Sequence, residues 1–453
     1  MTTLKTVILA AGQGTRMRSR IPKVLHKLAG KPMLERVIEA AQTISHAISI
    51  VYGYQGDTVK AALSSYDIDW VHQAEQLGTG HAVKQAVSES EKADQILVLL
   101  GDTPLITSQT LNDLREKTAK NEVGIVTIHL ENPYGLGRIL RDNNNHIVGI
   151  VEEKDATDEQ KKITEINTGI MLLPTQHLKQ WLAKLKNNNA QKEYYLTDIF
   201  AMAVAEKVAI KNVSPQFVEE VMGINTRVQL AHLERVYQQR VAEQLMLSGV
   251  TLLDPSRFDL RGTLTCAEDV TIDVNVIVEG NVSIGRGTSI GANTILKNCT
   301  IGENVVIEPN VVIDDSTVGN YCTIGPFARL RPGTQLAEKV KVGNFVETKK
   351  AIVGEGSKLP HLSYIGDADI GKHVNIGAGT ITCNYDGVNK FKTTINDGAF
   401  IGSDSQLVAP VTIGEGAYIG AGSTITKDAP AHKLTISRAK QITIEGWQPP
   451  KKG

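Results

Sequence analysis

The sequence is poor in aromatic residues and has almost no net charge. Phe, Trp and Tyr make up 5% of its 453 residues, and the formal net charge is -1. A neutral chain has no overall electrostatic attraction to nucleic acid or to an anionic membrane, so neither is expected as a partner. Charged residues make up 21% and hydrophobic residues 41%, which is typical of a globular chain whose length predicts two or more domains.

Cysteines and long apolar runs are also scarce. The four cysteines contain no Cys-x-x-Cys pair and no zinc spacing, so we expect reduced thiols: Cys266, Cys299, Cys322 and Cys383. No apolar run reaches about 18 residues, which predicts neither a transmembrane helix nor stable membrane insertion. The apolar segment 7–11 is too short for a signal peptide, and a cytoplasmic location is therefore predicted.

What the sequence does contain is a six-residue repeat between Ile272 and Ile425. Aliphatic residues followed by glycine recur along it, as in Ile284-Gly285 and Ile290-Gly291. This pattern is typical of a hexapeptide β-solenoid, in which three short strands form one triangular coil. The aliphatic residue points inward on each face, so the stacked coils bury a continuous apolar column.

The repeat is interrupted at several places. The intervals Leu296–Ile301, Ile313–Ile324 and Thr348–Val353 each fall one residue short, and the pattern disappears from Thr382 to Ala399. Breaks in a solenoid usually mark loops on one face, which is often the binding face. A purely structural rod with tolerated insertions explains the same pattern, and the repeat alone does not decide between them.

The first 100 residues predict an α/β domain. Apolar segments at 6–9, 48–52, 69–72 and 95–100 are expected strands, a helix is expected from Met33, and their alternation predicts a mostly parallel sheet. The first strand runs into a loop with Gly12 and Gly14, where backbone N–H groups can approach an anion beside Arg16 and Lys23. An ordinary βα turn with incidental glycines remains an alternative, because the spacing matches no standard phosphate-binding motif.

Two further polar segments follow predicted strands. Gln73 to Thr79 opens a helix, and Asp102 follows the most apolar strand. An Asp at this position is suited to Mg²⁺, which takes few protein carboxylates and completes its shell with phosphate and water. A helix N-cap is the alternative. A helical pattern from Arg227 to about Ser248 is expected to connect the sheet domain to the solenoid.

Leu9 to Met17, followed by Pro22-Lys23, resembles the nucleotidyltransferase fingerprint of sugar-nucleotide pyrophosphorylases. With the hexapeptide repeats, the whole chain resembles the bacterial bifunctional enzymes that make UDP-N-acetylglucosamine, a precursor of peptidoglycan and lipopolysaccharide. The resemblance implies a Rossmann-like nucleotidyltransferase domain (1–227), a linker helix (228–248) and a left-handed parallel β-helix acetyltransferase domain with a C-terminal tail (249–453). It also implies a homotrimer through the β-helix.

For the first domain, the resemblance implies a UDP-N-acetylglucosamine site. Arg16 and Lys23 would neutralise phosphates, and Asp102 and Asn225 would hold Mg²⁺. The implied binding residues are Leu9, Ala10, Ala11, Gly12, Lys23, Gln73, Gly78, Thr79, Leu100, Gly101, Asp102, Gly137, Glu152, Asn167 and Asn225. Leu100 departs from the family pattern, which often has Tyr there.

For the second domain, the resemblance implies acetyl transfer from acetyl-CoA to glucosamine-1-phosphate, before UTP is used. His361 is the implied general base, since imidazole titrates in the range needed to deprotonate an amine. Glu347 is a candidate for orienting it. The implied sugar-phosphate residues are Arg331, Lys349, Tyr364 and Asn375. The implied acetyl-CoA residues are Ala378, Asn384, Tyr385, Ser403, Ala421 and Arg438.

Taken alone, His361 is better explained as a surface-loop histidine, but its position near Tyr364 and the Lys349-Lys350 pair favours the general base. The alternative function is a monofunctional sugar-1-phosphate nucleotidyltransferase whose β-helix oligomerises or regulates. A non-catalytic sugar-phosphate-binding scaffold is a third hypothesis. The cations and polar groups of the solenoid argue against the second hypothesis, because a rod needs none of them, and Asp102 with Asn225 argues against the third. The tail from Ala429 to Trp447 is expected to be too irregular to continue the coils.

Overall fold

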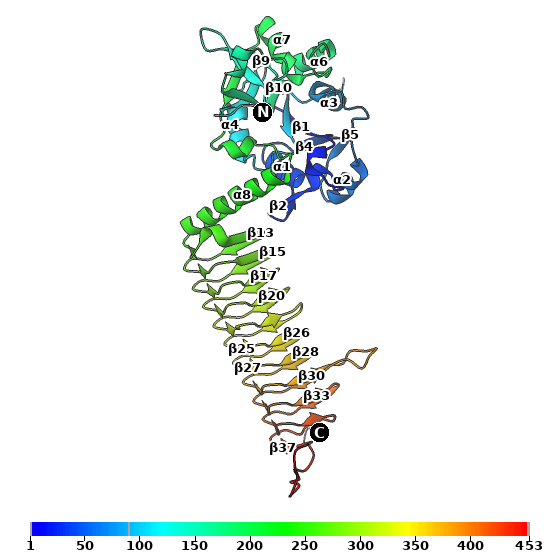
Figure 1. Cartoon of the computed structure of the whole chain (residues 1–453), viewed down its shortest axis with the longest axis vertical. Coiled ribbons are helices and arrows are strands. Elements are labelled where there is room, and N and C mark those ends of the chain that lie inside the picture. The colour runs from blue at the N-terminus through cyan, green and yellow to red at the C-terminus, as the bar shows by residue number, and fades with distance from the viewer. Residues whose placement is uncertain (1, 89–90, 451–453) are drawn as a thin grey trace. The chain divides into compact units, whose positions relative to one another are not determined.

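The structure is a computed structural model that describes residues 2–88 and 91–450. It divides into two compact units, Met1–Tyr237 and Gln238–Gly453 (Figure 1). In its described part, no helix combines the length and apolar content that a membrane span requires. Each unit is built around its own hydrophobic core.

Unit 1 contains one twisted sheet and the helices that cover it. The order of the strands is β11-β7-β10-β6-β1-β4-β5, with β8 and β9 as a hairpin beside β10. The strands are β1 (Leu4–Ala10), β4 (Ala47–Tyr52), β5 (Asp69–His72), β6 (Gln95–Leu100), β7 (Val123–His129), β8 (Arg138–Arg141), β9 (Ile147–Val151), β10 (Glu165–Pro174) and β11 (Ile210–Val213); β2 (Lys27–Leu28) and β3 (Lys31–Pro32) form a separate hairpin.

Most helices of unit 1 bury one apolar face, although the single turn α5 has no buried residue. In α1, which begins at Met33 as predicted, the buried side chains follow a three-and-four spacing that ends at Ala41. The helices are α1 (Met33–Gln42), α2 (Gly56–Ala62), α3 (Thr79–Ala86), α4 (Ser108–Lys117), α5 (Asp158–Lys161), α6 (Thr175–Lys184), α7 (Ile199–Ala205) and α8 (Arg227–Leu247), the last of which continues into unit 2.

The prediction of a mostly parallel sheet is confirmed, since β11 also pairs parallel with β7, and β10 is the exception in the main path of the sheet. β1, β4, β5 and β6 are parallel to one another, but β10 runs antiparallel to both β6 and β7. Between β7 and β10 the chain forms the β8–β9 hairpin and the single turn α5, with no long crossover helix. A return without such a crossover places the next strand antiparallel.

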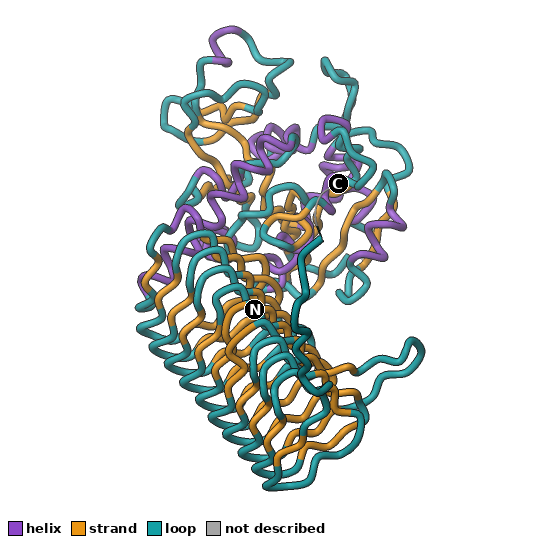
Figure 2. Tube along the Cα trace, turned by 60° about the horizontal axis from the view of Figure 1, so that its bottom comes forward, coloured by secondary structure: helices purple, strands orange, loops and turns teal. Residues whose placement is uncertain are grey.

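Unit 2 is a coil of short parallel strands, which confirms the predicted β-helix fold (Figure 2). Most coils pair with the next after 17 or 18 residues, as in Thr300–Thr317 and Thr317–Gln335. Inward aliphatic residues such as Ile290, Ile307 and Ile324 are almost fully buried and stack in one column.

The strands of unit 2 lie in two sheets, each running along the coil. One contains β12 (Thr251–Leu252), β14 (Thr271–Ile272), β16 (Ser289–Ile290), β19 (Val306–Ile307), β22 (Thr323–Ile324), β25 (Lys341–Asn344), β27 (Lys358–His361), β29 (Asn375–Ile376), β32 (Phe400–Ile401), β35 (Tyr418–Ile419) and β37 (Leu434–Thr435). The other contains β13 (Phe258–Cys266), β15 (Val276–Ile284), β17 (Ile295–Lys297), β18 (Thr300–Ile301), β20 (Val312–Asp314), β21 (Thr317–Val318), β23 (Arg329–Leu330), β24 (Gln335–Leu336), β26 (Glu347–Val353), β28 (Tyr364–Ile370), β30 (Ile381–Cys383), β31 (Thr393–Ile395), β33 (Gln406–Val408), β34 (Val411–Ile413) and β36 (Thr424–Ile425).

Two expectations about the solenoid need correction. The one-residue shortfalls form no loops: each is a tight corner with one left-handed residue, Asn298, Asp315 or Lys350. Only the 382–399 break forms a loop, and there Ala368 pairs with Thr393 across an insertion that projects beyond β30 (Figure 1). The tail is also more regular than expected, because β37 pairs with β35 and adds one more turn before the chain leaves the coil.

Candidate functional sites

The glycine loop after β1 brings a lysine close to the strand ends. Gly14 has a φ of 65° and precedes the short 3₁₀ turn Thr15–Met17. A Cβ on Gly14 would lie 2.5 Å from the Cβ of Lys23, so any side chain there would displace the lysine. The loop therefore requires glycine at this position, both for its conformation and for the approach of Lys23.

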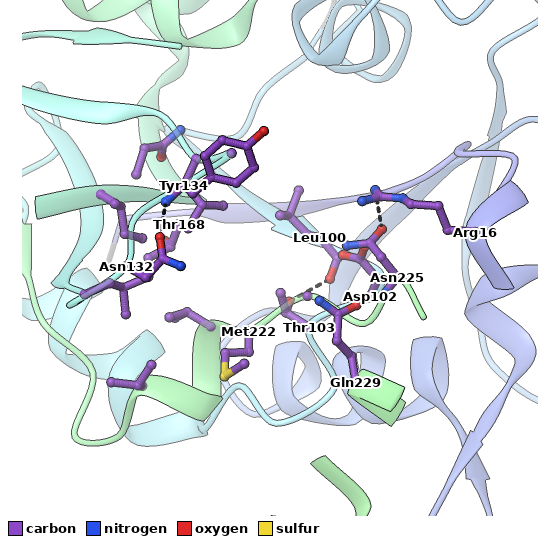
Figure 3. Close-up of a pocket in the computed structure, with 18 residues that line it drawn as sticks. Arg16, Leu100, Asp102, Thr103, Asn132, Tyr134, Thr168, Met222, Asn225 and Gln229 are labelled. Atoms are coloured by element: carbon purple, nitrogen blue, oxygen red, sulfur yellow. Dashed lines mark hydrogen bonds between the residues drawn. The ribbon is translucent and has the colours of Figure 1, made fainter. Parts of the chain in front are cut away.

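Lys23 meets the two residues that were assigned to the metal. Its Nζ lies 2.5 Å from Oδ2 of Asp102 and 3.1 Å from Oδ1 of Asn225. Arg16 donates from Nη2 to the same Asn225 oxygen at 2.9 Å, as Figure 3 shows. Residues that are 209 positions apart in the sequence thus meet at one point.

The helix N-cap alternative for Asp102 is wrong. The next helix, α4, begins at Ser108, and its N-terminus is capped by Thr107, whose hydroxyl accepts from the N–H of Thr110. Asp102 instead lies in a loop at the carboxyl end of β6, with its carboxylate in an ion pair with Lys23. Its side chain is therefore available to the cavity rather than committed to a helix terminus.

Two cavities meet at Leu100 and Asp102. Cavity A has a volume of about 300 Å³, and its lining includes ten of the predicted residues: Leu9, Ala10, Ala11, Gly12, Lys23, Gln73, Gly78, Thr79, Leu100 and Asp102. Cavity B, of about 550 Å³, is lined by Arg16, Asn167 and Asn225 together with Leu100 and Asp102. Gly101, between Leu100 and Asp102 in the sequence, is closely packed, because a Cβ there would lie 3.2 Å from Ala10 and Leu34.

Gly137 and Glu152 are not among the residues that line cavities A and B. Glu152 lines a third cavity, of about 400 Å³, where burial raises the pKa of its carboxyl group. The Glu152 Oε2 would lie 3.2 Å from a Cβ at Gly137. The Gly137 carbonyl accepts from the N–H of Asn167 at 2.9 Å, so a continuous set of contacts joins these two residues to cavity B.

The oxygen atoms of Asp102 and Asn225 fit a magnesium ion. Both oxygens contact a single atom, Lys23 Nζ, so both can also converge on a small cation. One carboxylate and one amide oxygen are the few hard ligands that Mg²⁺ takes when phosphates and water complete its shell. The residues that the structure describes contain no cluster of three or more His, Cys, Asp or Glu side chains, so a closed protein cage is not formed by them.

In unit 2, His361 lies at a corner of the coil and is held by Asn344 of the preceding coil. The two residues pair in register at the ends of β27 and β25, and His361 Nδ1 lies 2.7 Å from Asn344 Oδ1. Since an amide oxygen only accepts, Nδ1 carries the proton, and Nε2 keeps its lone pair. Glu347 does not orient this ring: its carboxylate instead accepts from Nη1 of Arg331 at 2.6 Å.

One face of the coil next to His361 carries Lys349 and Tyr364 of the predicted sugar-phosphate residues, whereas Asn375 lies in the other sheet. Glu347 pairs in register with Tyr364, and Lys349 pairs with Gly366. A Cβ on Gly366 would lie 2.5 Å from the Tyr364 hydroxyl, so the ring lies over this glycine. Asn375, in β29, belongs to the following coil.

Lys390, which sequence reasoning missed, reaches the same face from the inserted loop. Its ammonium group lies close enough to Lys349 to lower the pKa of that lysine. Two neighbouring cations that repel each other favour the binding of an anion between them. The interruption of the repeat was the signal that could have identified Lys390.

Four of the predicted acetyl-CoA residues form a column that continues from the corner of His361. Ala378 accepts at its carbonyl from the N–H of Asp404, and Ser403 accepts from Gly422. Arg438 donates from Nη1 to the Ala421 carbonyl at 2.8 Å. Coils are about 4.8 Å apart, so Ala378, Ser403, Ala421 and Arg438 mark a track of roughly 15 Å.

Asn384 and Tyr385 lie at a different corner from that column. Asn384 donates from Nδ2 to Asp367 Oδ2 at 2.5 Å, and Asp367 is the left-handed corner residue that separates the two halves of β28. Tyr385 begins the exposed loop and pairs with Lys390 across it. Within one chain, therefore, the structure does not bring these two residues to the other four.

The comparisons agree with this division of the chain. The family models of the MobA-like NTP transferase domain, the GMPPB C-terminal domain and the bacterial transferase hexapeptide repeat match residues 6–193, 260–361 and 392–427, respectively. A protein of Azoarcus sp. (strain BH72), "Bifunctional protein GlmU", is 53% identical over 450 residues, which is 99% of this chain and 100% of that protein. The chain belongs to the GlmU family.

Membership in the GlmU family makes the chain a bifunctional enzyme with uridylyltransferase and acetyltransferase activities. More distant likenesses include a nucleotidyl transferase from Methanothermobacter (18% identity, TM-score 0.40) and a UDP-glucose pyrophosphorylase complexed with UDP-glucose (19% identity, TM-score 0.43). Each covers 53% of this chain and 100% of the solved chain. At these values, neither bears on the activity of the GlmU-family chain.

Proposed function

We propose that cavities A and B form the uridylyl-transfer site and that the corner around His361 forms the acetyl-transfer site. The observation that supports the first assignment is the convergence of Lys23, Asp102 and Asn225 at the carboxyl ends of the strands. The second assignment is supported by the fixed proton on Nδ1 of His361. Together, the sites would convert glucosamine-1-phosphate, acetyl-CoA and UTP into UDP-N-acetylglucosamine, CoA and pyrophosphate.

At the uridylyl-transfer site, Gln73, Gly78 and the 9–12 backbone would bind the nucleotide in cavity A. N-acetylglucosamine-1-phosphate would lie in cavity B with Asn167. Its phosphate is already an anionic nucleophile, so positioning and charge neutralisation, not a general base, would provide catalysis. Asp102 and Asn225 would hold Mg²⁺, which neutralises phosphate charge when bound.

The two basic residues of this site, Lys23 and Arg16, are assigned separate roles. Lys23 is half enclosed and ion-paired to Asp102, which places its charge where cavities A and B meet. We assign it to the phosphate at which the bond forms. Arg16 donates to the same Asn225 oxygen as Lys23 and is assigned to the triphosphate and its departing pyrophosphate. Charge-assisted contacts of this kind are about twice as strong as neutral hydrogen bonds.

At the acetyl-transfer site, Arg331, Lys349 and Tyr364 would bind the phosphate and sugar, with Lys390 adding a further positive charge. The amine of glucosamine-1-phosphate is protonated at neutral pH and must lose a proton before it attacks the thioester. His361 Nε2 would take that proton. The nitrogen then forms a bond to the acetyl carbon, the bond from this carbon to sulfur breaks, and the second proton lost by the nitrogen goes to the sulfur, which leaves as the CoA thiol.

We further propose that the functional form is a homotrimer. At the corner beside the His361 column, Phe327 and Phe345 stack with ring centroids 5.3 Å apart, and Leu362 continues this exposed apolar row. A neighbouring chain would cover the row and supply Asn384 and Tyr385 to the acetyl-CoA track that they do not reach within one chain. Light scattering should therefore give three times the chain mass of 49.1 kDa; a monomeric mass would contradict the trimer.

A cytoplasmic location is also proposed. All four cysteines are free, and burial raises the pKa of Cys299 to about 12 and of Cys266 to about 11. Such thiols stay protonated and unreactive, which suits a reducing compartment.

Removal of Mg²⁺ is expected to affect only one of the two proposed activities, uridylyl transfer. With excess EDTA, we expect pyrophosphate release from UTP and N-acetylglucosamine-1-phosphate to fall by at least about 10³-fold, because several kcal/mol of charge stabilisation is lost. CoA release from acetyl-CoA and glucosamine-1-phosphate should be unchanged. The measurement is a thiol assay and a pyrophosphate assay on the same sample; uridylyl transfer that persists in EDTA would contradict the metal assignment.

Asn344 tests how His361 is held. Asn344→Leu removes the acceptor for Nδ1–H and should lower the kcat of acetyl transfer about tenfold, the effect of one lost hydrogen bond. Asn344→Asp keeps an acceptor and should retain most activity. Steady-state kinetics with both variants decide this, with pyrophosphate release as the folding control. Equal losses in both variants would mean that the contact does not fix the proton.

A further inference from the structure

The side chain of Gln73 is buried, and its amide nitrogen is hydrogen-bonded within the protein. Gln73 follows β5, is 3% exposed, and lines cavity A. Its Nε2 lies 3.3 Å from the Gly78 carbonyl and 3.0 Å from Nδ1 of His81. In the part of the chain that the structure describes, no hydrogen bond reaches Gln73 Oε1. The amide N–H groups are therefore used within the protein, and the oxygen remains for a ligand.

His81, in α3, lies between two glutamine amides. Nδ1 contacts the amide nitrogen of Gln73, and Nε2 lies 3.1 Å from the amide nitrogen of Gln85. A neutral imidazole has one donor and one acceptor, so the two amides cannot both donate to it. Gln73 is the fixed donor, because turning its amide would place its oxygen against the Gly78 carbonyl. Gln85 is exposed, and turning its amide by 180° exchanges its nitrogen for its oxygen, which then accepts from Nε2–H.

We propose that His81 is a positioning residue that sets the base specificity of the nucleotidyltransferase site by holding the Gln73 oxygen toward the base. This inference rests on the proposed binding of the nucleotide base by Gln73 and Gly78. It concerns what selects the orientation of Gln73. The tautomer of His81 with the proton on Nε2 leaves Nδ1 as an acceptor that holds the Gln73 amide together with the Gly78 carbonyl.

The chemistry of the two pyrimidines explains why this orientation matters. Uracil has an N3–H donor flanked by two carbonyl oxygens, whereas cytosine N3 is an acceptor. The Gln73 oxygen complements uracil N3–H and repels the lone pair of cytosine N3. The Gly78 N–H makes no backbone hydrogen bond within the described residues and can donate to the neighbouring carbonyl, which both bases have at C2. The orientation of one amide thus separates uracil from cytosine.

The glycine beside this amide keeps the geometry fixed. Gly78 has a φ of 113°, and a Cβ there would lie 2.7 Å from the Tyr194 carbonyl. The Leu77 carbonyl accepts from the Tyr194 N–H at 2.8 Å, which closes the loop against the 189–195 segment. Since the Gly78 carbonyl is held in this way, it accepts from the Gln73 amide together with His81 Nδ1, and both acceptors keep the Gln73 oxygen toward cavity A.

The test changes the tautomer of His81 by substituting Gln85, which contacts the exposed side of the imidazole ring. In Gln85→Glu the carboxylate accepts from Nε2–H and reinforces the present arrangement. In Gln85→Lys the ammonium donates to Nε2, which moves the proton to Nδ1 and turns the Gln73 amide. We expect the ratio of kcat/KM for UTP to that for CTP to fall about tenfold or more in Q85K, and to stay at or above the wild-type value in Q85E.

Additional variants and controls make the outcome decisive. His81→Leu removes the acceptor and should also lower the UTP/CTP ratio. A change in charge near the triphosphate affects UTP and CTP alike, so the ratio is insensitive to it, and CoA release reports folding. An unchanged ratio in both Q85K and H81L would overturn the inference. Wild-type protein that releases no pyrophosphate from UTP would instead refute the proposed site itself.

Discussion

Replacing His361 by alanine is expected to slow CoA release from acetyl-CoA and glucosamine-1-phosphate by roughly 10²–10⁴-fold, the usual contribution of a general base. The reason is local: Asn344 fixes the proton on Nδ1, and Nε2 is left as the base. The side chain is exposed at a corner of the coil, so truncation leaves no cavity in the apolar core. Pyrophosphate release from N-acetylglucosamine-1-phosphate should stay at the wild-type rate.

The matched control is His373→Ala. His373 is also an exposed histidine in a left-handed corner of the same coil, but it lies at another corner and has no assigned role. It should keep both activities. If H361A also lost pyrophosphate release, the two sites would not be independent, or the assembly would have failed. If H361A kept acetyl transfer, His361 would not be the base.

Replacing Asp102 by alanine is expected to have the opposite effect, with a loss of uridylyl transfer on the order of 10³-fold. Asp102 supplies the carboxylate of the proposed Mg²⁺ site, and metal binding contributes several kcal/mol of charge stabilisation. The variant also leaves Lys23 without its ion-pair partner at 2.5 Å. Acetyl transfer by the same sample, measured as free thiol, should not change.

Asp102→Asn distinguishes loss of the metal from loss of the ion pair. Asparagine keeps an oxygen that can accept from Lys23 but removes the negative charge that attracts the cation. We expect D102N to regain part of its activity at high Mg²⁺ concentration, and D102A not to do so. Asp57→Asn, on the exposed side of α2, is the control and should be active. Full activity of D102A at low Mg²⁺ would show that the carboxylate holds no metal.

The sequence predicted the repeating parts of the fold well because periodicity reports burial directly. The inward isoleucines of the coil and the apolar face of α1 follow fixed spacings, and both are buried. The direction of β10 could not be predicted in this way. It depends on the connection that precedes it, and the hairpin and single turn of that connection have no strong pattern.

The residues of the candidate sites were named from family resemblance, and the sequence could not supply their contacts. Asn344 and His361 are 17 positions apart, which equals one coil, so the length of the coil had to be known before they could be paired. Glu347 is close in the sequence to Lys349 and Tyr364, so it was a more obvious candidate than Asn344 for orienting His361. It is instead committed to Arg331, a contact between coils that no local pattern predicts.

The loop after β30 shows a second reason why contacts could not be predicted from the sequence. The loss of the repeat at 382–399 correctly predicted the position of a loop, but not what the loop would contact. Lys390 reaches Lys349 only because the loop turns back, with Tyr385 and Lys390 paired across it. A turn of that kind is determined by its own polar contacts, such as those from Asp386 to the N–H groups of Val388 and Asn389.

The most direct test of two independent sites in one chain is a single time course. The wild-type protein is given glucosamine-1-phosphate, acetyl-CoA, UTP and Mg²⁺, and free thiol and pyrophosphate are followed in the same sample. The account predicts that both are released and that pyrophosphate lags behind thiol, because only the acetylated sugar phosphate is uridylylated. Pyrophosphate formed from N-acetylglucosamine-1-phosphate, with no thiol released from acetyl-CoA and glucosamine-1-phosphate, would contradict it.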